Sequence, residues 1–229
     1  MRRRRPPAAD VPKLERGLAE LQRSHGPAHA ETLAAMNELA TALLARGDAD
    51  QARRLLEASL AMHRRTYGAE HSATVDVASR LAAACFADHD PQAARSLQVG
   101  VVEARRRTLG EEAPETLTAT TGLARILADC GDLAGARDLY RHVFAARRRV
   151  FGEDHSATLG AMTGLATALH LSGEREESRS LYEHVLERRR ALLGEDHPKT
   201  LSARRNLERA RRTEGAEDAG LDDERTGGS

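Results

Sequence analysis

The residues best suited to chemistry are ten histidines and two cysteines, and four of the histidines recur at a fixed spacing. His29 and His71 are 42 residues apart, as are His155 and His197. A metal ion needs several ligands at about 2.1 Å, whereas equivalent residues of stacked helices lie about 8–10 Å apart. We therefore expect these histidines to stabilise the turns before helices, and we predict no metal site and no cofactor.

The two cysteines lack the setting of a catalytic thiol. Two thiols are too few for a disulfide framework or a four-cysteine zinc site, so we expect both to be reduced. Cys85 takes a position at which other copies of a repeat carry leucine, which predicts a small buried side chain. The sequence also lacks a phosphate-binding glycine loop, a His-Glu-x-x-His motif and a Gly-x-Ser-x-Gly motif. We therefore predict no catalytic residue and no enzymatic activity.

Composition argues against two further classes of partner. The 229 residues include 35 basic and 35 acidic side chains, and only 3% are aromatic. Because binding to nucleic acid or to an anionic membrane surface requires an excess of Lys and Arg, we expect neither partner. No apolar region follows the basic start, and no segment approaches the roughly 18 apolar residues of a membrane span. A cytoplasmic location is the expectation that remains.

An internal repeat of 42 residues explains the histidine spacing. Three other residue types recur with this period in five copies: Gly26, Gly68, Gly110, Gly152 and Gly194; Thr32, Thr74, Thr116, Thr158 and Thr200; and Leu39, Leu81, Leu123, Leu165 and Leu207. A fixed period of about 20–50 residues is typical of a solenoid, in which each unit buries its apolar face against the next.

Each copy of the repeat predicts two helices. Residues 158–171 carry apolar side chains at helical spacing, and Gly173 ends this run. A second run covers residues 174–193 and ends at Gly194. Small residues recur where the two helices must approach closely, as at Ala124. We therefore predict an all-α, right-handed solenoid of helix-turn-helix repeats.

The predicted solenoid covers residues 10–213. Its parts are a half repeat at 10–24, full repeats at 25–66, 67–108, 109–150 and 151–192, and a terminal helix at 193–213; a disordered basic N-terminus at 1–9 and a disordered tail at 214–229 flank it. The second full repeat is expected to be the least regular. His89 stands there in place of a turn glycine, and Gly100 falls within the second helix.

Several stretches of the sequence resemble a known repeat family. Gly-Glu-Asp-His-Ser-Ala-Thr-Leu at 152–159 and the matching residues at 194–201 resemble the start of the 42-residue tetratricopeptide repeat of kinesin light chains. That repeat type is similar to arrays attached to bacterial signalling ATPases. The resemblance implies that the first helices line the concave side of the solenoid and bind a protein or peptide. Two adjacent asparagines bind peptide in kinesin light chains, but the pair is not intact in any repeat here, so we expect no asparagine ladder.

Setting aside the packed positions leaves small and polar residues on the implied binding side. We call this set the first-helix stripe, and it consists of Asn37, Glu38, Thr41, Asp76, Ser79, Arg80, Thr118, Thr121, Arg125, Thr163 and Thr167. We predict that Arg80 and Arg125 bind acidic groups of a ligand and that Asn37 hydrogen-bonds its main chain. The predicted function is a non-catalytic scaffold that binds a partner segment in this groove.

Two other functions remain open. The chain fits a sensor or regulatory segment of a larger signalling ATPase, and it fits a module that forms a homo-oligomer through its incomplete first repeat.

Arginine clusters end the second helices, at 64–65, 105–107, 147–149 and 188–190. They are interpreted as a solvated face, because acidic residues follow them closely. The alternative for them is a basic ridge for an acidic peptide or a phosphate.

Overall fold

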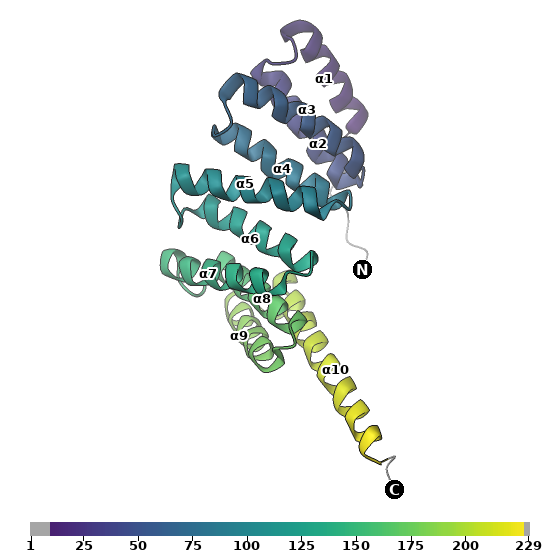
Figure 1. Cartoon of the computed structure of the whole chain (residues 1–229), viewed down its shortest axis with the longest axis vertical. Helices are drawn as coiled ribbons and strands as arrows, with labels where there is room; N and C mark the ends of the chain where they lie inside the picture. The colour runs from purple at the N-terminus through teal and green to yellow at the C-terminus, as the bar shows by residue number, and fades with distance from the viewer. Residues whose placement is uncertain (1–9, 227–229) are drawn as a thin grey trace. The chain divides into compact units, whose positions relative to one another are not determined.

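The computed structural model describes residues 10–226 of the chain, with side chains up to Arg212. These residues form helices only, in the order α1 (Val11–His25), α2 (Ala30–Arg46), α3 (Ala49–Tyr67), α4 (Ser72–Ala87), α5 (Pro91–Leu109), α6 (Pro114–Asp129), α7 (Leu133–Phe151), α8 (Ser156–Leu171), α9 (Arg175–Leu193) and α10 (Pro198–Thr226) (Figure 1). The predicted all-α repeat solenoid is therefore confirmed. None of these helices combines the length and the apolar character that crossing a membrane would require.

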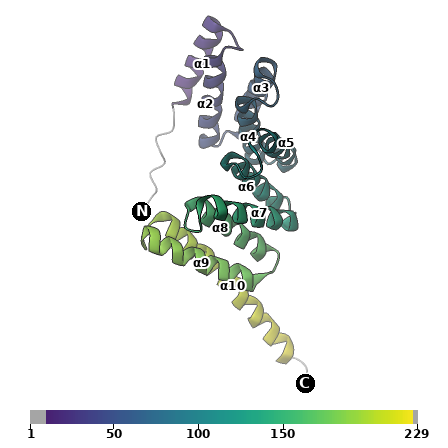
Figure 2. The same cartoon turned by 90° about the vertical axis from the view of Figure 1, so that its left-hand side faces the viewer.

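The described residues form two compact units that divide within α6, after Ala119. In unit 1, which ends at Ala119, α1 packs on α2, and α3 and α4 each pack on the helices before and after them. In unit 2, which begins at Thr120, α7, α8, α9 and α10 pack in the same successive way. Figures 1 and 2 both show these neighbours side by side within each unit.

The turns between paired helices require a left-handed backbone conformation. Gly47, Gly131 and Gly173 have φ values of 100°, 84° and 82°, which glycine adopts without a steric penalty. His89 occupies the same place in the second repeat with a φ of 60°. The irregularity predicted for that repeat therefore lies in its turn. The expected irregularity at Gly100 was wrong, because α5 continues unbroken through it.

The recurring histidines cap the first helices. The Nδ1 atoms of His29, His71 and His155 accept hydrogen bonds from the backbone N–H groups of the second residue beyond each of them, at 3.3, 3.3 and 3.2 Å. The Nδ1 atom of His197 accepts from the backbone of Lys199 at 3.2 Å. These contacts satisfy backbone donors that a helix N-terminus leaves unpaired, so the predicted turn-stabilising role is confirmed.

Small residues fill the closest helix contacts, as predicted. Ala40 and Ala82 are 1% exposed and Ala124 and Ala166 are fully buried in the first helices. Cys85 is also buried at 1% exposure, and burial raises the pKa of its thiol, which agrees with its interpretation as a core residue. In unit 2, α8, α9 and α10 share one apolar cluster that includes Tyr182 and Leu207.

The two ends of the chain differ in what the structure describes. The segment 1–9, predicted to be disordered, lies outside the described residues. At the other end α10 continues to Thr226, so the terminal-helix boundary predicted at residue 213 falls inside this helix. Alanine, glutamate and leucine beyond residue 213 have favourable helix propensities, which is consistent with the longer helix.

Candidate functional site

In unit 1, the first-helix stripe contains a chain of hydrogen bonds that links α2 to α4. The hydroxyl of Ser59 on α3 donates to Oδ1 of Asn37 at 2.9 Å, which fixes the orientation of the Asn37 amide. The Thr41 hydroxyl donates to the backbone carbonyl of Asn37 at 2.8 Å and accepts from Nη1 of Arg80 at 3.0 Å. Asn37 and Arg80 thus present oriented donors on adjacent first helices.

The acidic residue of α4 in the stripe has a partner within the protein. Nη2 of Arg105 on α5 donates to Oδ1 of Asp76 at 2.7 Å, while Nη1 of the same guanidinium donates to the carbonyl of Glu115 at 2.9 Å. Glu38 is exposed and Ser79 is half-buried. Of the two acidic residues in the stripe, Asp76 therefore has an ion-pair partner on α5, and Glu38 is exposed.

Threonine hydroxyls in the stripe mostly donate within their own helices. Thr118 donates to the Pro114 carbonyl at 2.7 Å, and Thr163 donates to the Leu159 carbonyl at 2.7 Å. Thr167 donates to the Thr163 carbonyl at 2.9 Å. Such bonds use the hydroxyl proton but leave oxygen lone pairs available as acceptors. The threonines therefore contribute small surface and acceptors more than donors.

In unit 2 the stripe comprises positions on α6 and α8. Thr121 is half-buried and Arg125 is exposed on α6. On α8, the Thr163 hydroxyl accepts from Nη2 of Arg189 at 3.3 Å, and the Thr167 hydroxyl lies 2.8 Å from that of Tyr182. Side chains of the second helix α9 thus hydrogen-bond to this part of the stripe, as Ser59 of α3 does to Asn37 in unit 1.

One arginine in each of three clusters contacts the start of the next first helix, which was not predicted. Arg147 and Arg189 are only 7% and 9% exposed, and burial lowers the pKa of both guanidinium groups. They donate to the carbonyls of Ala157 at 3.1 Å and Lys199 at 3.3 Å, at the start of the next first helix. The interpretation of the clusters as wholly solvated was therefore wrong for these residues and for Arg105.

The spacing of these arginines in the sequence could have indicated their shared structural role. Arg105, Arg147 and Arg189 differ by the repeat period of 42 residues, and His63 takes the equivalent position in the first full repeat. His63 is buried and its Nδ1 lies 2.9 Å from the Ser59 carbonyl. A polar residue conserved in register within one chain indicates a fixed contact rather than a solvated face.

A close contact between helices shapes the stripe in unit 2. A Cβ atom added at Gly164 on α8 would lie 2.3 Å from Cε1 of Tyr140 on α7. The Tyr140 ring is 8% exposed, and burial raises the pKa of its hydroxyl. The absence of a side chain at Gly164 therefore leaves room for the Tyr140 ring.

The residues that could bind a metal do not gather. No group of three or more His, Cys, Asp or Glu side chains in the described part of the chain is placed to hold a metal ion.

The described side chains of the stripe offer an amide, guanidinium groups, one open carboxylate and small polar surface. Chemically, such a surface hydrogen-bonds a main chain and pairs with carboxylates.

Repeated helical pairs held by buried small residues define a helical repeat protein. Models of the tetratricopeptide repeat match residues 31–107, 116–157 and 158–199, and the chain belongs to the tetratricopeptide repeat family. This fold is typical of non-catalytic scaffolds for protein interaction. No match was found among curated proteins.

Solved structures similar to this chain include kinesin light chain-like repeat proteins. Two structures from Podosopora anserina, described as a kinesin light chain with nearly identical tetratricopeptide-like repeats, share 28% identity and give TM-scores of 0.73 and 0.72. The matches cover 83% and 85% of this chain and 90% and 92% of those chains. BtubC (BKLC) from P. vanneervenii has the same fold at 16% identity and a TM-score of 0.69, covering 91% of each chain.

Proposed function

We propose that this protein is a cytoplasmic, non-catalytic scaffold in which the unit 1 part of the first-helix stripe binds an extended acidic segment of a partner protein. The observation that carries the proposal is the hydrogen-bonded chain of Ser59, Asn37, Thr41 and Arg80. It orients an amide and a guanidinium on neighbouring helices before any ligand arrives. Preorganised donors lower the entropy cost of binding.

The amide of Asn37 supports main-chain recognition. Its Oδ1 accepts a hydrogen bond from Ser59, and its two N–H groups donate to no residue that the structure describes, so they are available to a ligand. An extended peptide presents carbonyl groups at regular intervals that match such a donor. Arg80 keeps further N–H groups beside the one that Thr41 accepts, and these suit a carboxylate.

The experiment is a selection of peptides from a random display library on the immobilised full chain. We expect the enriched peptides to carry Asp or Glu and to bind the Asn37→Ala/Arg80→Ala variant at least about tenfold more weakly, a loss of about 1.4 kcal/mol. Arg54→Ala is the matched control, because Arg54 is an exposed arginine on α3 whose ion pair with Asp50 spans one helical turn. Neutral peptides, or equal binding to the double variant, would refute the proposal.

A further inference from the structure

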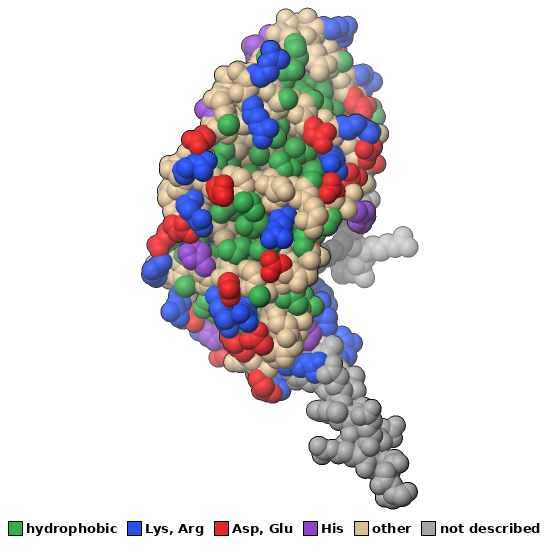
Figure 3. Space-filling model, viewed as in Figure 1, with side chains coloured by type: hydrophobic (Ala, Val, Ile, Leu, Met, Phe, Trp, Pro, Cys, Tyr) green, Lys and Arg blue, Asp and Glu red, His purple; other side chains and the backbone are tan. Residues whose placement is uncertain are grey.

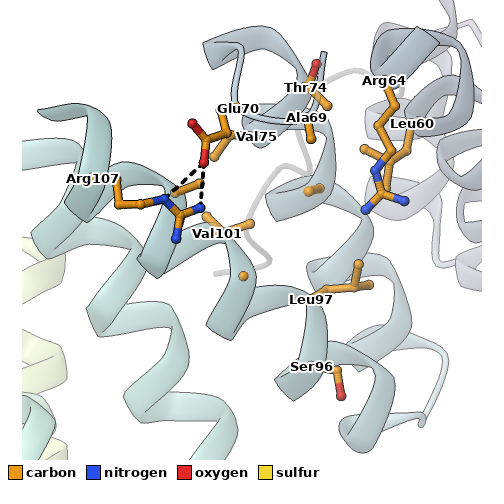
Figure 4. A pocket seen from close by; sticks show the side chains of 13 residues that line it. Leu60, Arg64, Ala69, Glu70, Thr74, Val75, Ser96, Leu97, Val101 and Arg107 are labelled. Carbon is orange, nitrogen blue, oxygen red and sulfur yellow. Dashed lines mark hydrogen bonds and ion pairs between the residues drawn. The ribbon is translucent and has the colours of Figure 1, made fainter.

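A groove lies between the second helices α3 and α5 of unit 1, away from the first-helix stripe. It consists of two adjoining hollows of about 370 and 340 Å³, which share Leu60, Arg64 and Leu97. We call these two hollows the α3–α5 groove, and Figure 4 shows the first of them. Each volume is within the range of about 300–1,000 Å³ that is usual for ligand pockets.

Gly100 opens the groove on the α5 side. The equivalent positions in the other full repeats are Ala58, His142 and His184, so a side chain is the rule at this place. A Cβ atom at Gly100 would meet nothing within 4 Å, and helix packing therefore does not require glycine. Glycine inside a helix costs about 1 kcal/mol relative to alanine. Gly100 thus lowers the stability of α5, and it leaves space in the hollow that it lines together with the buried Val101.

Arg64 gives the groove an uncompensated charge. In two of the three equivalent positions, Arg106 and Arg190 form ion pairs with Glu111 and Glu195, and in the third the Arg148 guanidinium lies 5.6 Å from the centroid of the Phe144 ring. Ala69 stands where those glutamates occur, and the Arg64 guanidinium has no ion pair or hydrogen bond with any residue that the structure describes. An arginine fork without a partner beside an apolar surface is complementary to a carboxylate.

The opposite wall does not supply that carboxylate. Glu70 and Arg107 pair with each other at 2.8 Å across this end of the groove, as the dashed lines in Figure 4 show. Between the charged walls the surface is apolar, and Figure 3 shows hydrophobic side chains gathered between α3 and α5. Arg53 and Glu57, which line the second hollow, pair with each other at 3.1 Å. Among the described lining residues, Arg64 is therefore the one cation without an ion pair, and it lies beside apolar surface.

We propose that the α3–α5 groove binds a segment of a partner protein in which a large apolar residue stands beside an acidic one. The apolar side chain fills the hollow next to Gly100, and the neighbouring carboxylate pairs with Arg64. Charge complementarity favours this occupant over a basic or an uncharged segment. The site lies on different helix faces from the first-helix stripe, so it does not depend on the function proposed for that stripe.

The test uses the full chain and the capped peptide Ser-Asp-Phe-Glu-Leu-Ser, with binding followed by methyl NMR and by fluorescence anisotropy. We expect peptide-dependent shifts at Leu60, Leu97 and Val101. A peptide with Asn and Gln in place of Asp and Glu should bind at least about tenfold more weakly, because it cannot form an ion pair with Arg64.

Two variants restore residues that other repeats carry and should leave the fold intact. Ala69→Glu supplies a carboxylate to Arg64, and Gly100→His fills the hollow; each should weaken binding at least about tenfold. Arg65→Ala, an exposed neighbour outside both hollows, should change affinity less than about twofold. Absence of binding at millimolar peptide, unchanged affinity in both variants, or shifts confined to the first-helix stripe would overturn the proposal.

Discussion

Replacement of Gly164 by alanine tests the close packing between α7 and α8. The added Cβ atom would lie 2.3 Å from Cε1 and 2.7 Å from Cδ1 and Cζ of Tyr140. Because Tyr140 is only 8% exposed, the ring or one of the two helices must shift within a packed environment. Overpacking of this kind costs about 1–3 kcal/mol, while alanine gains about 1 kcal/mol in helix propensity. The expected net result is a loss of about 0–2 kcal/mol.

Gly160 provides the matched control, because it lies in the same helix and a Cβ atom there meets nothing within 4 Å. Gly160→Ala should therefore raise the free energy of unfolding by up to about 1 kcal/mol. The assay is urea denaturation followed by circular dichroism, with the two variants compared under identical conditions. A Gly164→Ala variant as stable as Gly160→Ala would refute the packing argument.

A double variant separates the ring contact from other effects. In a Tyr140→Ala background the obstacle to the new Cβ atom is gone, so Gly164→Ala should become stabilising by up to about 1 kcal/mol. Coupling of this kind is expected for residues in direct contact. If the effect of Gly164→Ala were the same in both backgrounds, Tyr140 would not be the cause of the cost.

Three further predictions concern the turns and one surface ion pair. His89→Gly should stabilise the chain by about 1 kcal/mol in urea denaturation, because His89 has a φ of 60°; no gain would contradict a strained turn. His155→Ala should cost about 1 kcal/mol through loss of the helix cap, whereas His155→Asn should retain most of the stability, and equal losses would contradict capping. The hydrogen bond from Arg188 at 2.6 Å lowers the pKa of the Asp154 carboxyl below its value in the unfolded chain. The pair therefore stabilises the protein above about pH 4, and this contribution is lost as the pH falls through the folded-state pKa. Asp154→Asn should thus destabilise at pH 7 but not near pH 2, and a pH-independent difference would contradict this.

The repeat architecture follows from the sequence because its period is carried by several residue types at once. Gly152, Thr158 and Leu165 each recur every 42 residues, and the histidine caps recur with them. Such a pattern constrains helix ends and buried faces together. For this reason the turn glycines, the buried alanines and the role of His155 were all predictable.

Contacts between neighbouring helices were harder to predict. Arg147 is one of three consecutive arginines, and successive residues of a helix point about 100° apart, so only one of the three faces the next repeat. Composition alone treats the three as equivalent. The contact of Tyr140 with Gly164 spans a turn and two helices, and no local pattern indicates it.

The stripe was predictable as a set of positions but not as a set of hydrogen bonds. Helical spacing places Asn37 and Thr41 one turn apart, as the structure shows. The spacing does not reveal that the Thr41 hydroxyl donates to a backbone carbonyl or that the Ser59 hydroxyl donates to the Asn37 amide oxygen. Those bonds decide which donors face a ligand.

The self-association hypothesis concerns α1. Val11 and Leu18 are buried, whereas Leu14 and Leu21 are half-buried. If α1 forms an interface between copies, the mass measured by light scattering should rise with concentration in the wild type and should stay at the monomer value in a Leu14→Glu variant. A monomer at every concentration would exclude this hypothesis.

The first-helix stripe is tested most directly by the NMR signals of the Asn37 side-chain amide and the Arg80 Nε–H group during titration with a selected acidic peptide. Both signals should shift in proportion to saturation, because these groups donate to the bound segment, and Asn37→Ser identifies the amide signal. Saturable binding that leaves both signals unchanged would contradict the proposed role of the stripe.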